Sequence, residues 1–176
     1  MADASLANPL SLVAVDIGSS HVKLKTPDLQ LSLAGQVARD AGHVSRADNQ
    51  LKAAHRPTKI ATSDGTFLVG ANAHAWGDRK EDHDVLDTQR LLGGSKIKAL
   101  FYGALTEIVR KQGLFDSPLA VCVGTPVGID KAGRAKVEAW LMGQHTWEAD
   151  DVAVTVNVQH AHTIPQTSAV VFDYAL

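Results

Sequence analysis

The feature that most constrains the fold is a short apolar segment that ends in a carboxylate and a tight turn. Residues 12–17 are apolar except for Asp16, which predicts a strand buried on both faces until the carboxylate interrupts it. Gly18 and the two serines after it predict a turn, and residues 21–25 then alternate polar with apolar side chains, as a half-exposed strand does. With a third alternating segment at 29–33, we expect an antiparallel meander of three strands.

Helical and strand patterns alternate in the second half of the chain. Apolar side chains recur at helical spacing from Ile97 to Val109, with Ser95 as the expected N-cap and Gly113 as the stop. A meander followed by helix, strand, helix, strand and helix is the ribonuclease-H-like α/β arrangement. After the first helix we expect a strand at 119–123, a helix at 131–142, a strand at 152–158 and a helix at 167–176.

The region between the meander and the first long helix has weaker patterns. Two short apolar segments, 59–62 and 66–69, flank Ser-Asp-Gly at 63–65, which predicts a β-hairpin. We interpret this region as a small inserted α+β subdomain. The expected division is an α/β core at 1–34 and 95–176 and an insertion at 35–94.

Composition and charge exclude several classes of protein. Lys and Arg total 17 against 19 Asp and Glu, a formal net charge of -2, so we expect no direct nucleic-acid surface. No apolar run approaches the roughly 20 residues that cross a bilayer, and no Lys or Arg precedes Lys23, so we expect a cytoplasmic protein without a membrane partner. The single cysteine, Cys122, excludes a disulfide framework and lies in an apolar run, which predicts a buried thiol.

The turn after the first strand carries the clearest chemistry. Asp16 stands where it could hold a hydrated Mg²⁺, because magnesium keeps several waters and takes few carboxylates. Gly18 lets the backbone approach a ligand, and Lys23 could contact a phosphate as a point charge. The amides expected to face phosphate oxygens are those of Ser19, Ser20 and His21. The alternative is an ordinary β-hairpin with an exposed aspartate.

Two other groups of residues have simpler interpretations. His160 and His162 would lie on one face of a strand as a possible zinc half-site, but strand-end histidines facing solvent explain them better. Trp140 and Trp147 are expected to belong to the core.

Four segments together resemble one protein family. The motif DIGSSHVK at 16–23 resembles the first phosphate motif of the superfamily of actin, sugar kinases and heat-shock chaperones. Three further segments resemble those of ParM-type and archaeal actin-like proteins. They are FLVGANA at 67–73, VCVGTPV at 121–127, with Thr125 where many relatives have Leu, and TIPQTSA at 163–169.

This resemblance implies a site for ATP and Mg²⁺. Asp16 would bind the metal through water, Lys23 would contact a phosphate, and Gln166 would orient the attacking water. Gly18, Ser19 and Ser20 would form the phosphate turn. Without the resemblance, Gln166 is simply a residue at a helix start that bonds to nearby backbone.

The resemblance also implies a function. The complete protein would be an ATPase that assembles into ATP-dependent filaments, for plasmid or other DNA segregation and with an adaptor protein as a possible partner. The second Asp-x-Gly motif and the adenosine-binding segment of the family have no counterpart here, so we expect the second domain to be absent and this chain alone to be inactive. The alternatives are a sugar-kinase or chaperone-type relative, or a stand-alone binding module without catalysis.

Overall fold

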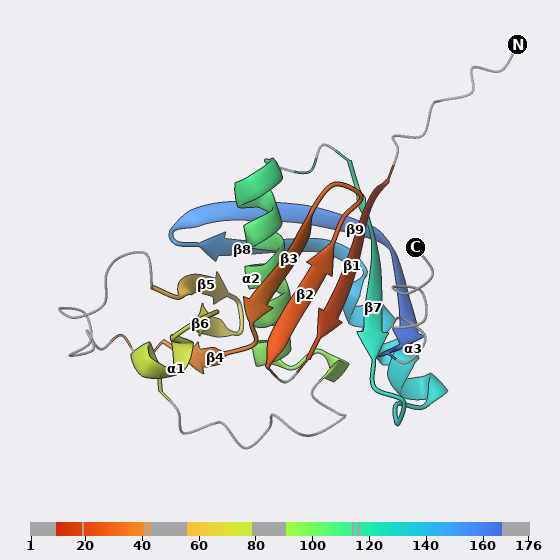
Figure 1. Cartoon of the computed structure of the whole chain (residues 1–176), viewed down its shortest axis with the longest axis horizontal. Coiled ribbons are helices and arrows are strands. Elements are labelled where there is room, and N and C mark those ends of the chain that lie inside the picture. The colour runs from red at the N-terminus through yellow and green to blue at the C-terminus, as the bar shows by residue number, and fades with distance from the viewer. Residues whose placement is uncertain are drawn as a thin grey trace, which may run out of the picture.

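The computed structural model describes residues 10–18, 20–40, 42, 56–78, 91–113, 115 and 117–166 (Figure 1). Nine strands form one sheet in the order β3-β2-β1-β7-β9-β8-β5-β6-β4. The strands are β1 (Ser11–Ile17), β2 (His21–Lys25), β3 (Gln30–Ala34), β4 (Val37–Arg39), β5 (Thr58–Thr62), β6 (Gly65–Val69), β7 (Leu119–Thr125), β8 (Gly143–Ala149) and β9 (Val152–Pro165). The helices are α1 (Ala73–Trp76), α2 (Ser95–Gln112) and α3 (Lys131–Leu141).

The predicted meander is confirmed. β1, β2 and β3 pair antiparallel in sequence order, and β1 also pairs in parallel with β7. β7 in turn pairs in parallel with β9. The α/β arrangement of a meander followed by alternating helices and strands therefore holds, and three parallel strands lie at its centre.

The sheet curls around α2. This helix contacts β2 near one end of the strand order and β4, β5, β6 and β8 at the other, which a flat sheet would not allow. In Figure 1 the helix stands behind the meander, with the small strands to one side. Ten of its residues are buried, and they form one hydrophobic core with the inward side chains of the strands. Phe101, Ala104 and Leu105 are fully buried in it.

β8 is an element that sequence patterns did not predict. It pairs antiparallel with β9 along its whole length, through a two-residue turn of Asp150 and Asp151, both with positive φ. Its inward residues include His145 and Trp147, and a histidine is an unusual core residue in a strand pattern. Because of the buried histidine and the turn without glycine, the sequence pattern does not predict this hairpin.

Two smaller expectations are wrong. Gly94 occupies the N-cap position of α2, and Ser95 is the first helical residue, without a side-chain cap. Cys122 is half-buried because alternate residues of β7 face outward, whereas Val121 and Val123 face the core. Trp147 is buried as expected, and the half-buried Trp140 donates its indole N–H to the Leu91 carbonyl.

The predicted hairpin between β5 and β6 is present, and these strands join the main sheet through the pairing of β5 with β8. β4 extends the same sheet on the far side of β6. The division into a core and an inserted subdomain stays a prediction. The helix expected at 167–176 lies outside the described residues.

None of the helices in the described part of the chain is both long and apolar enough to span a bilayer.

Candidate functional site

Three parallel strands end at the same edge of the sheet. Asp16 near the end of β1 pairs with Gly124 of β7, and Gly124 pairs with Ile164 of β9. The three arrowheads point to one edge in Figure 1, close to α3. In open α/β sheets, ligands bind outside the carboxyl ends of parallel strands. We therefore expect a ligand-binding site at this edge of the sheet.

Asp16 and Gln166 meet at this edge although 150 residues separate them in the sequence. The Gln166 side-chain nitrogen Nε2 donates a hydrogen bond to Asp16 Oδ1 over 2.7 Å. Both residues are half-buried. The predicted metal ligand and the predicted water-orienting amide are thus brought into direct contact.

Gly124 makes this contact possible, because it lies on the strand between the two residues. A Cβ atom at this position would come within 3.3 Å of Gln166 Cγ and 3.6 Å of Asp16 Oδ1. A side chain at this position would therefore crowd the Gln166 side chain where it reaches Asp16. The sequence pattern gave no reason to assign this role to Gly124.

The turn after β1 is tight, and backbone hydrogen bonds within it and from Gly35 hold it in place. The Gly18 amide donates to the His21 carbonyl over 2.9 Å, and a Cβ on Gly18 would lie 3.0 Å from that oxygen. Gly35 donates its amide to the Ser20 carbonyl, and a Cβ there would lie 3.1 Å from the His21 nitrogen. Gly35 was missed by sequence reasoning. Ser19 lies outside the described residues.

Two basic side chains extend from β2 beside Asp16. Lys23 pairs directly with Asp16 across the antiparallel strands, so both side chains lie on the same face of the sheet. Lys23 and His21 are exposed, and the His21 Nδ1 atom lies 3.2 Å from Ser20 Oγ. A carboxylate, an amide, a lysine and a glycine turn therefore share one edge of one face.

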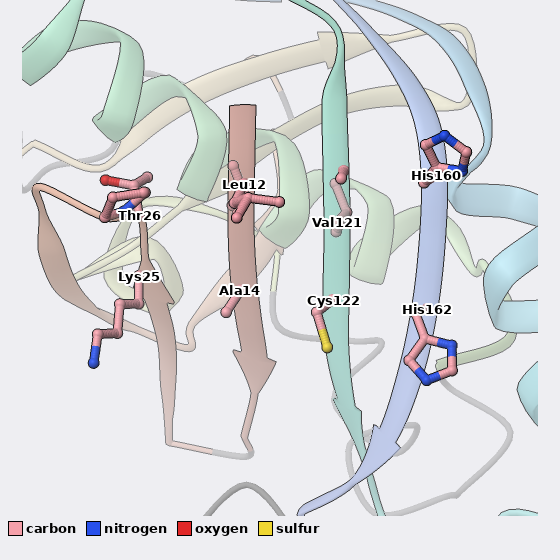
Figure 2. A pocket seen from close by; sticks show the side chains of 11 residues that line it. Leu12, Ala14, Lys25, Thr26, Val121, Cys122, His160 and His162 are labelled. Atoms are coloured by element: carbon pink, nitrogen blue, oxygen red, sulfur yellow. The ribbon is translucent and has the colours of Figure 1, made fainter. Parts of the chain in front are cut away.

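The exposed histidines do not form part of this group. His160 and His162 extend from β9 into a shallow hollow of roughly 460 Å³, which Leu12, Ala14 and Cys122 also line (Figure 2). Burial raises the pKa of the Cys122 thiol. Within the described ranges, no three His, Cys, Asp or Glu side chains are arranged to hold a metal ion. The hollow lies nearer the start of β1 than Asp16 does, and its lining is largely apolar.

A family model described as the N-terminal domain of actin-like proteins matches residues 14–168. This range includes every residue of the group around Asp16. No curated protein sequence matches the chain.

Three solved structures show the same fold. The apo ParM protein of pSK41 is 19% identical, with a TM-score of 0.70 over 95% of this chain and 53% of that one. The filament of AlfA from the B. subtilis plasmid pLS32 is 11% identical, with a TM-score of 0.66 over 88% of this chain and 55% of that one. The non-polymerising A278D mutant of MamK, bound to AMPPNP, is 14% identical, with a TM-score of 0.58 over 96% of this chain and 45% of that one. The chain thus spans about half the length of these structures.

Proposed function

The chain belongs to the family of actin-like protein N-terminal domains, and from this premise we propose that it supplies the first half of an ATP site in a filament-forming ATPase. The observation that carries the proposal is the contact of Gln166 with Asp16 beside a tight glycine turn. A structural role alone gives no reason for a carboxylate, an amide and a lysine to gather at the open end of parallel strands. Such strand ends are where α/β sheets bind their ligands.

The residues present fit Mg²⁺ and the phosphates of ATP. Asp16 offers a hard oxygen ligand, which magnesium prefers. Gly18 and Gly124 have no side chains, which allows the tight turn after Asp16 and the close approach of Gln166 to Asp16. The amides of Ser19, Ser20 and His21 would bind phosphate oxygens, and Lys23 would contribute a positive charge. When bound, Mg²⁺ would offset the charge of the phosphates.

Gln166 has the chemistry needed to hold a water molecule for hydrolysis. With Nε2 donating to Asp16, its carbonyl oxygen is the atom that can accept a hydrogen from a water. Asp16 would thereby fix the orientation of the amide, so that the water is held in one position relative to the carboxylate. Positioning of this kind is a large part of catalysis in phosphoryl transfer.

Filament formation and a role in DNA segregation belong to the complete protein. AlfA forms filaments, and MamK is bound to AMPPNP in the structure that resembles this chain. By analogy, we propose that the complete protein is cytoplasmic and self-associates with bound ATP, with an adaptor as partner in segregation. A sugar-kinase or chaperone-type relative would use the same phosphate turn without forming filaments. For this chain alone we propose weak binding and negligible hydrolysis, because one domain cannot close over the nucleotide.

Nucleotide binding to this chain can be tested by NMR. We expect Mg-ATP to shift the amide resonances of Gly18, Ser20 and His21 and the side-chain amide of Gln166, and Mn²⁺ in place of Mg²⁺ to broaden the same signals. Asp16→Asn keeps the side-chain size and an oxygen for Gln166 but loses the negative charge. This variant should therefore abolish the metal-dependent part of the shifts and the broadening by Mn²⁺. Asp28→Asn, in the exposed turn between β2 and β3, is the matched control. An Asp16→Asn chain that binds Mg-ATP like the wild type would contradict the proposal.

A further inference from the structure

The second half of β9 is supported by a strand on only one side. β8 pairs with β9 from Val152 to Val158, whereas β7 pairs with it from Val158 to Pro165. Among the described residues, no strand follows β8 on that side beyond Val158. Helix α3 contacts β9 instead. The part of β9 that leads to Gln166 therefore depends on α3 for its second neighbour.

A β-bulge in this strand determines which face Gln166 occupies. Leu119 pairs with Val158 and Ala120 with His160, so β9 carries one extra residue, Gln159. Before the bulge Val154, Val156 and Val158 are buried, and after it His160 and His162 are exposed while Thr163 is buried. A shift of one residue moves every following side chain to the opposite face. Without it, Gln166 would follow the core face and lie away from Asp16.

Glu138 of α3 is hydrogen-bonded to the strand after the bulge. Its Oε1 atom accepts hydrogen bonds from both the amide nitrogen and the hydroxyl of Thr163, each over 2.8 Å. His162 Nδ1 lies 3.7 Å from the same oxygen. Hydrogen bonds to a charged acceptor are stronger than neutral ones. In a register one residue earlier or later, Thr163 would point to the outer face and its hydroxyl could not reach Glu138.

The pKa of Glu138 agrees with this geometry. The bond from the Thr163 hydroxyl lowers it most, and the Thr163 amide and the charges of His162 and Arg134 lower it further, although burial works in the opposite direction. The carboxylate is thus the form that the end of β9 stabilises.

We infer that Glu138 is a positioning residue for Gln166, which it presents to Asp16 by fixing the register of β9 through Thr163. The hydrogen bonds and the ion pair of Glu138 in the described part of the chain are with Thr163 and His162 and not with Asp16 or Gln166, so it acts only through the strand. Its importance for catalysis rests on the function proposed above, but its effect on the contact between Gln166 and Asp16 does not.

The side-chain amide of Gln166 reports on this contact directly. Its ¹H–¹⁵N signals in this chain, without nucleotide, are identified by their loss in Gln166→Glu, and Asp16→Ala gives their position when the contact is broken. We expect Glu138→Ala to move them toward the Asp16→Ala position. Glu138→Gln should leave them near the wild-type position, because the amide oxygen can accept both bonds from Thr163.

The proposal is overturned if Glu138→Ala keeps the dispersed spectrum of a folded chain and the wild-type Gln166 signals. If Glu138→Ala does not fold, Thr163→Val removes only the hydroxyl bond and keeps the shape of the side chain. It should shift the Gln166 signals part of the way, and unchanged signals would again overturn the proposal.

A second readout concerns ATP turnover by the complete protein that contains this chain. We expect Glu138→Ala to lower kcat by on the order of tenfold to a hundredfold with a smaller change in KM, because misplacement of a catalytic group acts mainly on the chemical step. In a Gln166→Ala background the same change should have little further effect. A full additional loss there would contradict the inference. If the complete protein has no ATPase activity, the proposed function fails, and the NMR measurement still decides the role of Glu138.

Discussion

Replacement of Gln166 with glutamate would bring two carboxylates together at the strand ends. In the structure the amide nitrogen of Gln166 lies 2.7 Å from Asp16 Oδ1. Two unit charges at that distance repel by about 1.5 kcal/mol in bulk water and by about 6 kcal/mol at an effective dielectric constant of 20. The side chains can swing apart, since both are only half-buried, so the lower value is the better guide. The lost hydrogen bond to a charged group adds roughly 1.5 kcal/mol.

We therefore expect Gln166→Glu to lower the free energy of unfolding by about 3 kcal/mol at pH 8. The penalty should shrink as the pH falls toward 5, because one proton shared by the two carboxyls replaces the repulsion with a hydrogen bond. The sign follows from proton linkage: the folded variant holds this proton more tightly than the unfolded chain does, so its stability relative to the wild type rises as the pH falls.

Urea denaturation at pH 8 and pH 5 measures this effect. Asp16→Asn in the Gln166→Glu chain reverses donor and acceptor, so the double variant should recover most of the lost stability at pH 8. Gln144→Glu, at an exposed position of β8, is the matched control and should change stability by less than about 0.5 kcal/mol. The contact between Asp16 and Gln166 would be refuted if Gln166→Glu were as stable as the wild type at pH 8, or if Asp16→Asn brought no recovery.

Three further predictions concern other parts of the molecule. Thr106→Val should cost about 1–3 kcal/mol in urea unfolding, because the buried Trp147 indole loses the hydroxyl that accepts its hydrogen bond over 2.9 Å, whereas Thr106→Ser should retain the bond and cost less. The lowered pKa of Glu138 means that its stabilising effect is complete above the ordinary carboxyl range and is lost as the pH falls through it. The stability difference between wild type and Glu138→Gln should therefore shrink between about pH 5 and pH 3, and a constant difference would contradict this. Cys122, whose pKa burial raises, should react with a thiol reagent at pH 8 far more slowly in the native chain than in urea.

Elements defined by local pattern could be predicted from the sequence. The meander has alternating side chains and short turns, and α2 has apolar residues at helical spacing from Ile97 to Val109. β8 could not be predicted in the same way, because its core face depends on contacts far away in the chain. His145 can be buried because both of its ring nitrogens have hydrogen-bond partners. Nε2 donates to the Leu141 carbonyl, and Nδ1 accepts from the Tyr102 hydroxyl. Sequence alone does not reveal that both ring nitrogens are satisfied.

The candidate site likewise has a part that could be predicted from local sequence and a part that could not. Asp16, Gly18 and Lys23 lie within eight residues, so one strand and one turn predict their common location. Gln166 came from the resemblance alone, since nothing near it in sequence indicates a ligand. Its contact with Asp16 depends on the order of β1, β7 and β9, on the absence of a side chain at Gly124, and on the bulge in β9. These are properties of the assembled sheet.

The most direct test of the account is Mg-ATP turnover by the complete open reading frame that encodes this chain, followed together with light scattering. We expect ATP to raise the scattering, the scattering to decay as ATP is hydrolysed, and Asp16→Ala to abolish both signals. Hydrolysis without scattering would indicate a kinase or chaperone-type relative. Turnover that survives Asp16→Ala, or no response to nucleotide in the wild type, would contradict the account.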